Sequence, residues 1–331
     1  MPAVDGHTWR VSHDEPRVPT TADVNQAIER VRGRIRRTPV LHTDVGDLGL
    51  DASVALKLEC LQHAGSFKAR GALNSALGSG VPAAGLIAAS GGNHGVAVAR
   101  TGRVLGVPAV IFVPEVSAPA KVERVRAQGA TVHIAGALYS DAQEACDLRA
   151  AESGALNIHP YNAPLTVAGQ ATLGVELIEQ VPDVDTVLVA VGGGGLAAGL
   201  GVGLPSSVRI VAVETEGCPA LHAAVAAGRP VTVEPTGVAA DALGAKQVGV
   251  LPWQILEGRA ESIVVPDAAV LAARQALWAE MQIVAEPAAA TPLAALRTGE
   301  YRPEPGERVV VVVCGANTDP SDLMGPPPTA G

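Results

Sequence analysis

The sequence has few aromatic residues, little charge and few cysteines. Phe, Trp and Tyr make up 2% of its 331 residues, which argues against a protein that stacks bases or sugars on its side chains. Charged residues make up 17% and give a formal net charge of −9, and no Lys/Arg cluster is present, so we expect no nucleic-acid partner. Hydrophobic residues make up 48%, which is enough for a core and excludes a disordered chain.

Signals for metal binding, disulfides and export are also lacking. The cysteines Cys60, Cys146, Cys218 and Cys314 form no CxxC or CxxxxC pair, so we expect reduced thiols rather than a zinc site or a disulfide framework. The N-terminus has no apolar segment of the kind found in a signal peptide. Residues 186–208 carry no charge, but seven glycines and Pro205 interrupt them, so we expect no membrane span. The sequence predicts a soluble cytoplasmic protein.

Short apolar runs alternate with helical segments along most of the chain. Near-continuous Val/Ile/Leu runs such as TVLVAV at 186–191 and RVVVVVC at 308–314 indicate strands buried on both faces. The sequence therefore predicts an α/β fold with two open, twisted, mostly parallel sheets flanked by helices. We expect a polar arm at 1–20, a smaller α/β domain at 50–155, a larger one formed by 21–49 and 156–320, and a flexible tail at 321–331.

The strongest local feature is the glycine run Gly192 to Gly195, followed by Leu196, between a predicted strand and a predicted helix. Backbone N–H groups without side chains, at a helix N-terminus, form a site for a phosphate. Gly192-x-Gly194-x-x-Ala197 also matches the dinucleotide fingerprint, and Glu214 ends the next strand as an acidic residue of that fingerprint does. From the residues alone, a nicotinamide dehydrogenase therefore remains an alternative.

Three further segments lie at predicted turns or strand ends. Gly65 to Ala72 (GSFKARGA) contains Lys68 and Arg70, a pair that on its own is typical of a solvated helix face. Ser90 to Gly95 (SGGNHG) is a strand-to-helix turn whose N–H groups can hold a carboxylate, and its histidine is more typical of a turn cap than of a general base. Cys314 to Asn317 (CGAN) follows the last apolar strand, at the sheet edge where ligands bind in open α/β folds.

Together these segments resemble the fold-type II pyridoxal-phosphate (PLP) enzymes, in the serine/threonine dehydratase and serine racemase branch. The resemblance covers roughly residues 20 to 320 and rests on the ordered set SFKARGA, SGGNHG, GGGGL, AVE, AEP and CGAN. It implies PLP as the cofactor, a small amino acid as the substrate, and a homodimer.

The resemblance also assigns roles by position. Lys68 matches the lysine that holds the cofactor as a Schiff base, Asn93 the residue that hydrogen-bonds the phenolic oxygen of the cofactor, and Cys314 the Ser/Cys that faces the pyridine nitrogen. The full cofactor set that it implies is Phe67, Lys68, Asn93, Gly192, Gly193, Gly194, Gly195, Leu196, Glu286 and Cys314. The loop that receives the substrate carboxylate is Ser90, Gly91, Asn93 and His94.

The sequence departs from the family pattern at four places. Ala220 stands where some relatives have a second metal-binding carboxylate, so we do not expect the family's Mg/Ca site, for which Glu214 is the remaining candidate ligand. Ala242 follows Asp241 where relatives often have Asp-Gly. Gly91 stands where racemases of the family have a proton-donating serine. The short, proline-rich tail also leads us to expect no regulatory domain.

We therefore expect a dehydratase that converts L-threonine, L-serine or a related β-hydroxy amino acid to a 2-oxo acid and ammonia, with Lys68 as the catalytic residue. The rival interpretations are a serine racemase, an NAD-dependent dehydrogenase and a non-catalytic binding protein. A racemase needs a second acid on the face opposite Lys68. A dehydrogenase needs Glu214, and a binding protein needs neither Lys68 nor Asn93.

Overall fold

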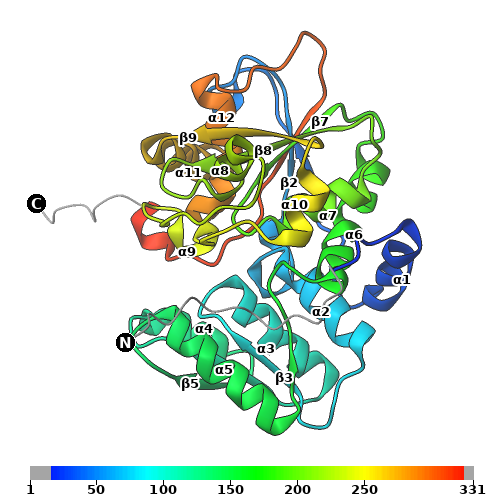
Figure 1. The fold of residues 1–331 in the computed structure, drawn as a ribbon. Helices are drawn as coiled ribbons and strands as arrows, with labels where there is room; N and C mark the ends of the chain where they lie inside the picture. The colour runs from blue at the N-terminus through cyan, green and yellow to red at the C-terminus, as the bar shows by residue number, and fades with distance from the viewer. Residues whose placement is uncertain (1–15, 324–331) are drawn as a thin grey trace, which may run out of the picture.

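The computed structural model describes residues 16–323, which form two α/β lobes (Figure 1). We call them the large lobe, built on a six-stranded sheet, and the small lobe, built on a four-stranded sheet. Within the described residues no helix is long and apolar enough to cross a membrane. The α/β architecture with two mostly parallel sheets is the fold class that the sequence predicts.

The large sheet has the strand order β1-β2-β10-β7-β8-β9, and only β1 runs antiparallel to its neighbour. Its central strands are fully buried, in agreement with their uninterrupted Val/Ile/Leu sequences. The strands span β1 (Val40–His42), β2 (Ala55–Lys57), β7 (Thr186–Ala190), β8 (Arg209–Thr215), β9 (Ala260–Val265) and β10 (Val309–Val312).

Helices cover the large sheet and pack against one another. The helix α12 contacts β7, β8 and β9 and packs on α11, while α7 contacts β7 and β8 and packs on α6 and α10. The helices of this lobe span α1 (Thr21–Val31), α6 (Pro164–Gln180), α7 (Gly195–Gly203), α8 (Ala220–Ala227), α9 (Ala240–Leu243), α10 (Val250–Leu256), α11 (Asp267–Met281) and α12 (Pro287–Thr298).

The small sheet is entirely parallel, with the order β5-β4-β3-β6. Both α3 and α5 pack on β3 and β4, and α2 packs between α3 and the helix α6 of the large lobe. The elements span α2 (Lys68–Ser79), β3 (Leu86–Ala89), α3 (Asn93–Leu105), β4 (Ala109–Val113), α4 (Pro119–Arg126), β5 (Thr131–Ile134), α5 (Tyr139–Ser153) and β6 (Leu156–Asn157).

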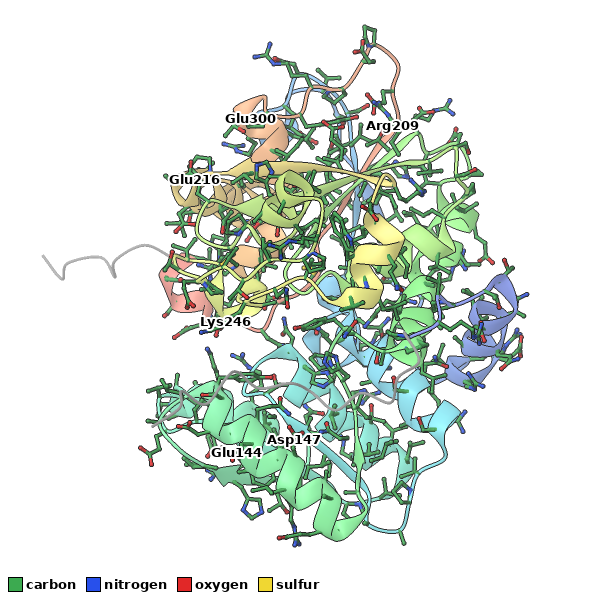
Figure 2. The ribbon with its side chains drawn as sticks, viewed as in Figure 1. Glu144, Asp147, Arg209, Glu216, Lys246 and Glu300 are labelled. Atoms are coloured by element: carbon green, nitrogen blue, oxygen red, sulfur yellow. The ribbon has the colours of Figure 1, made fainter. Side chains whose placement is uncertain are left out.

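The labelled charged side chains lie on the outside of both lobes. Figure 2 shows Glu144 and Asp147 on α5 of the small lobe, and Arg209 and Glu300 at the far end of the large lobe. Arg209 pairs there with Glu307 at 2.6 Å. The buried polar groups discussed below are therefore exceptions that need a physical reason.

The domain boundaries differ from the sequence-based expectation at both ends of the smaller domain. The strand β2, which falls inside the predicted 50–155 unit, pairs with β1 and β10 in the large sheet. The strand β6, which begins at Leu156, belongs to the small sheet through its pairing with β3. The reason for the first error is that the partner β10 lies near the other end of the chain, so the local pattern carries no information about it.

The terminal predictions fall partly outside the described residues. Of the predicted polar arm 1–20, residues 16–20 are described, and Thr20 caps α1 through a capping box with Asp23. Of the predicted flexible tail 321–331, residues 321–323 belong to a 3-10 turn, Pro320–Leu323, in which Leu323 is buried and Asp322 pairs with Arg274 at 2.6 Å. That part of the tail is therefore ordered, and residues 324–331 lie outside the described chain.

Candidate active site

The segment before α2 pairs with the residues that follow β10, the last strand in the sequence. The chain turns sharply through two left-handed residues, Ala64 (φ +62°) and Gly65 (φ +70°), before α2 begins. Ser66 then forms a β-bridge with Gly315, and the Phe67 N–H donates to the Cys314 carbonyl at 3.2 Å. Segments from opposite ends of the sequence therefore meet where the sequence predicts a single site.

Lys68 is the first residue of α2, and its amine lies in a weakly hydrated environment. Its Nζ donates to the backbone carbonyl of Pro160 at 2.8 Å and lies 5.2 Å from the centre of the Phe67 ring. Desolvation lowers the pKa of Lys68 to about 8, and Cys314 and Glu286 only partly offset it. An amine with such a pKa carries a usable lone pair near neutral pH.

The glycine run forms the turn from β7 into α7, and neighbouring atoms leave no space for side chains. A Cβ on Gly193 would lie 2.5 Å from the Tyr161 ring, and one on Gly192 would lie 2.9 Å from the backbone of Leu243. Gly194 caps α7 with φ +90°, a conformation that favours glycine. The first N–H groups of α7 have no intrahelical partners, so this turn is suited to an anion such as phosphate.

Asn93 and Glu286 come from different lobes and meet beside the glycine of the CGAN segment. The Asn93 amide donates to Glu286 Oε1 at 2.6 Å. A Cβ on Gly315 would lie 2.1 Å from the same oxygen, so a side chain there would displace the Glu286 carboxyl group. Burial raises the pKa of Glu286 to about 7, which keeps much of this carboxyl protonated near neutral pH.

Cys314 lies at the carboxyl end of β10 and is almost fully buried. Burial, with a contribution from the nearby Glu286, raises the pKa of its thiol well above the ordinary value. The thiol is therefore neutral at physiological pH. A neutral thiol is a weak hydrogen-bonding partner and supplies no counter-charge to a heterocycle placed against it.

The loop from Ser90 to His94 joins β3 to α3. Ser90 Oγ accepts from the Gly92 N–H at 3.3 Å, and Gly92 caps α3. The ring of His94 is buried and its Nε2 donates to the Ile158 carbonyl at 2.7 Å, while burial lowers its pKa to about 3. The imidazole is thus neutral, and its Nε2–H is used by the Ile158 carbonyl and not by a substrate carboxylate.

Comparison with known proteins identifies what this arrangement belongs to. The family model of pyridoxal-phosphate dependent enzymes matches residues 31–315. The chain belongs to this family. It is 37% identical over 302 residues to L-threonine ammonia-lyase of Geobacter sulfurreducens, a match that covers 89% of this chain and 75% of that protein. It is 36% identical to phenylserine dehydratase of Ralstonia pickettii, with 91% and 95% covered.

Solved structures agree with the family assignment. Maize serine racemase has a TM-score of 0.87 at 32% identity, with 93% of this chain and 96% of that chain covered. A threonine deaminase from T.th. has a TM-score of 0.85 at 35% identity, with 91% and 99% covered. The predictions of the family, the fold class, the PLP cofactor and a PLP-dependent lyase are therefore confirmed.

The residues present fit PLP. The glycine cradle suits its phosphate, the partly buried amine of Lys68 suits its aldehyde, and the neutral thiol of Cys314 suits its ring nitrogen. These groups come from the starts of α2 and α7 and from the end of β10, elements that the fold brings to one place. The side chains and glycines of this chain are therefore chemically suited to hold the cofactor of the family.

Glu214 lies at the carboxyl end of β8, and backbone donors occupy both of its carboxyl oxygens. Its two carboxylate oxygens accept from the N–H groups of Leu221 and His222, at 2.8 and 2.7 Å, at the start of α8. Burial nevertheless raises the pKa of Glu214 to about 8. Between residues 16 and 323, no group of three His, Cys, Asp or Glu residues could hold a metal ion. A carboxylate buried in this way is also poorly placed to bind a ribose, as the dehydrogenase alternative requires.

Several residues that contact the site were given no role by the sequence analysis. The carbonyl of Pro160 accepts from Lys68, and the adjacent Tyr161 packs against the glycine turn. His159 caps the same segment, since its Nδ1 accepts from the N–H of Asn162 at 2.8 Å. The dipeptide His159-Pro160 contributes to the family resemblance, but a carbonyl is present at every residue, so no sequence signal marks this one as the partner of Lys68.

A cavity of about 230 Å³ lies between the lobes on the outer side of Glu286. Its lining includes small apolar side chains such as Ala239 and Ala288, and the polar residues Lys121, Arg124, Asp241 and Asn317. Lys121 of α4 pairs across the cavity with Asp241 of α9, so these charges neutralise one another. The cavity therefore combines apolar walls with charges of both signs, and Glu286 is the residue that it shares with the candidate site.

Proposed function

We propose that this protein is a PLP-dependent dehydratase that converts L-threonine or L-serine to a 2-oxo acid and ammonia. The observation that carries the proposal is the position of Lys68. Its amine has a lowered pKa of about 8, contacts a carbonyl rather than a carboxylate, and lies where the Asn93, Glu286 and Cys314 segments meet.

Residues from both lobes would hold the cofactor. Lys68 would bind its aldehyde carbon, Gly192 to Leu196 its phosphate, and Cys314 its ring nitrogen, with Phe67, Asn93 and Glu286 around the ring. When bound, PLP withdraws electrons from the α-carbon of the amino acid attached to it. The protein decides which bond breaks and excludes competing reactions.

Lys68 would act as the base once the substrate amine has displaced it. The desolvation that lowers the pKa of Lys68 favours its neutral form, which is the form that can accept the α-proton. The loop from Ser90 to Asn93 would orient the substrate carboxylate through the N–H groups at the start of α3. Both neighbouring histidines, His94 and His159, have lowered pKa values because they are buried, so they remain uncharged and do not compete for the proton.

The overall reaction is an elimination followed by hydrolysis. The α-proton goes to Lys68 and the bond from Cβ to the hydroxyl breaks; one proton is returned to the leaving oxygen, so that it departs as water and the protons balance. The released enamine adds water and loses ammonia, which gives 2-oxobutanoate from threonine or pyruvate from serine. Relatives named for threonine and phenylserine differ in the β-substituent. We therefore extend the proposed substrate class to β-hydroxy amino acids with uncharged side chains.

We further propose that the protein works in the cytoplasm as a homodimer. Free cysteines at all four positions support a reducing compartment. The family resemblance supports the dimer. Sedimentation of the purified protein at several concentrations tests the dimer, and a monomer at all of them contradicts it.

The decisive experiment is chemical trapping combined with product analysis. Purified protein reconstituted with PLP should absorb in the visible range, and borohydride should bleach this band and attach the cofactor to Lys68, as located by peptide mass mapping. L-Threonine should yield 2-oxobutanoate and ammonia in equal amounts. A colourless protein, a label on another lysine, or binding of threonine without ammonia release would overturn the proposal.

A further inference from the structure

A chain of side-chain amides connects the turn before α2 to the candidate site. The Asn317 Nδ2 donates to the Ala64 carbonyl at 2.7 Å and to Asn93 Oδ1 at 2.6 Å. The Asn93 Nδ2 donates in turn to Glu286 Oε1 at 2.6 Å. The hydrogen bonds therefore all run in one direction, from Asn317 through Asn93 to Glu286.

The backbone sets this direction. The carbonyl of Ala64 can only accept, so Asn317 must turn its NH₂ group towards it. The second N–H of the same group then faces Asn93, which must present its oxygen to Asn317. The NH₂ group of Asn93 is consequently left facing Glu286. One fixed acceptor thus determines the orientation of two amides that are otherwise free to flip.

The neighbours of Asn317 leave its side chain little freedom. Ala64 is a non-glycine residue with φ +62°, and the next residue, Gly65, also has positive φ. A Cβ on Gly65 would lie 2.6 Å from Asn317 Oδ1, so a side chain at residue 65 would push the Asn317 amide away. From the small lobe, Arg124 of α4 donates to the Asn317 carbonyl at 2.8 Å. Contacts from three segments therefore converge on this residue.

We propose that Asn317 is a positioning residue that dictates which end of the Asn93 amide faces the bound cofactor. The inference rests on the proposed function, since it needs PLP at Lys68. With its NH₂ group directed into the site, Asn93 offers a donor to an acceptor oxygen on the cofactor ring. Without Asn317, either amide orientation of Asn93 becomes accessible, and the donor is lost for part of the population.

The first test is Asn317→Asp, which keeps the shape but removes both donors. The new carboxylate attracts the NH₂ group of Asn93 and so turns it away from the site. We expect PLP to bind about tenfold more weakly, the factor that corresponds to one hydrogen bond. We also expect the pH midpoint of the visible band of bound PLP to rise, because the ring oxygen loses a donor that favours its ionised form. The matched control is Asn25→Asp on the exposed face of α1.

A second variant separates positioning from mere structural support. When Asn317→Asp is combined with Glu286→Gln, the reversed bonds between residues 317, 93 and 286 are complete again, because the introduced glutamine can donate to the oxygen of a flipped Asn93, and only the Ala64 carbonyl lacks its donor. Thermal stability should then return towards that of Glu286→Gln alone, while the spectral midpoint stays shifted. If the midpoint also returns, the role of Asn317 is structural and the inference is wrong.

Gly65→Ala provides the same test if the aspartate variant does not fold. It displaces Asn317 with a methyl group and changes no polar atom, and we expect the midpoint to shift in the same direction. Alanine also strains the backbone at this positive φ, so Gly33→Ala, at φ +70° with open space around it, is the control for strain alone. Wild-type protein that takes up no PLP on Lys68 would defeat the proposed function. Wild-type protein that does, with unchanged affinity and midpoint in both variants, would defeat this inference alone.

Discussion

Two buried polar clusters meet at the start of α2. In one, carboxylates neutralise the cations; in the other, the cation has no carboxylate partner. In the first, Arg70 donates to both oxygens of Glu59 at 2.8 and 2.7 Å, and to Glu176 at 3.0 Å. Lys57 donates to the same Glu176 at 2.5 Å. Although burial opposes the charge on Glu59, Arg70 outweighs it and lowers the pKa of that carboxyl. Two cations and two carboxylates thus neutralise one another.

The second cluster lies two residues earlier on the same helix and leaves its cation without such a partner. Lys68 contacts the carbonyl of Pro160, the thiol of Cys314 is neutral, and burial raises the pKa of Glu286 to about 7. Arg70 is therefore fixed and inert, while Lys68 is an amine that loses its proton easily. Both cations lie in weakly hydrated surroundings, but Arg70 has two carboxylates as acceptors whereas Lys68 has a carbonyl, so desolvation lowers the pKa of Lys68 with little to offset it.

The largest effect should follow from removing the amine of the second cluster. Lys68→Ala should abolish threonine turnover and borohydride labelling while leaving the circular dichroism spectrum unchanged. Loss of a general base alone costs about 10² to 10⁴ in rate, and loss of the cofactor attachment adds to it. Lys246→Ala, at an exposed lysine, is the control and should keep full activity. Turnover of more than a few per cent in Lys68→Ala would exclude Lys68 as the base.

Breaking the first cluster should cost stability. Arg70→Met leaves Glu59 and Glu176 without their shared partner and should lower the free energy of unfolding by about 3–5 kcal/mol. Arg126→Met, which removes the exposed pair with Glu123, should cost less than about 1 kcal/mol. Urea denaturation of both variants measures the difference. Equal losses would mean that Arg70 is not the central residue of a buried ion cluster.

The two clusters also show where prediction from the sequence reaches its limit. The glycine turn, the loop around Asn93 and the strand end at Cys314 are predictable, because each joins a helix or strand whose pattern is visible locally. The pair Lys68 and Arg70 is typical of a solvated helix face, yet Arg70 is completely buried. Its partner Glu176 is 106 residues away, so nothing local indicates the burial.

The other features that the sequence does not predict also depend on contacts between distant parts of the chain. The position of β2 in the large sheet depends on β10, and the low pKa of Lys68 depends on the desolvation created by the assembled lobes. The family resemblance assigns His94 to the substrate loop, whereas its ring is committed to the Ile158 carbonyl. Sequence patterns identify which residue types are present at the site, but the long-range packing decides which of their atoms are free.

A smaller effect should appear in the stability of the apoprotein. The folded pKa of Lys68, about 8, lies below its ordinary value of 10.5, so between these values the unfolded chain binds a proton that the folded protein does not. Wild-type stability should therefore rise with pH across this window. Lys68→Met should be more stable by about 2 kcal/mol at pH 7, allowing for the lost hydrogen bond and partial exposure, and the gain should vanish near pH 10.5. Urea midpoints at about pH 7 and 10 measure it, and a gain that is independent of pH contradicts the desolvation of Lys68.

The smallest effect concerns the face of the site opposite Lys68, which distinguishes elimination from racemisation. The family resemblance places Gly91 on that face, where glycine itself supplies no donor and the nearest hydroxyl is that of Ser117, so we expect L-serine to give pyruvate with negligible D-serine. A Cβ on Gly91 would lie 3.3 Å from Ser117 Oγ, a contact that a small shift of the serine side chain relieves, so Gly91→Ser should fold normally. The new hydroxyl can supply a proton to the α-carbon, where general acid catalysis is worth about 10² or more in rate. We therefore expect D-serine to become detectable in this variant while elimination still dominates, with Gly91→Ala as the control for bulk alone. Chiral chromatography decides the point: D-serine formed by the wild-type protein at a rate comparable to pyruvate would make it a racemase, and none from Gly91→Ser would mean that the loop does not face the α-carbon.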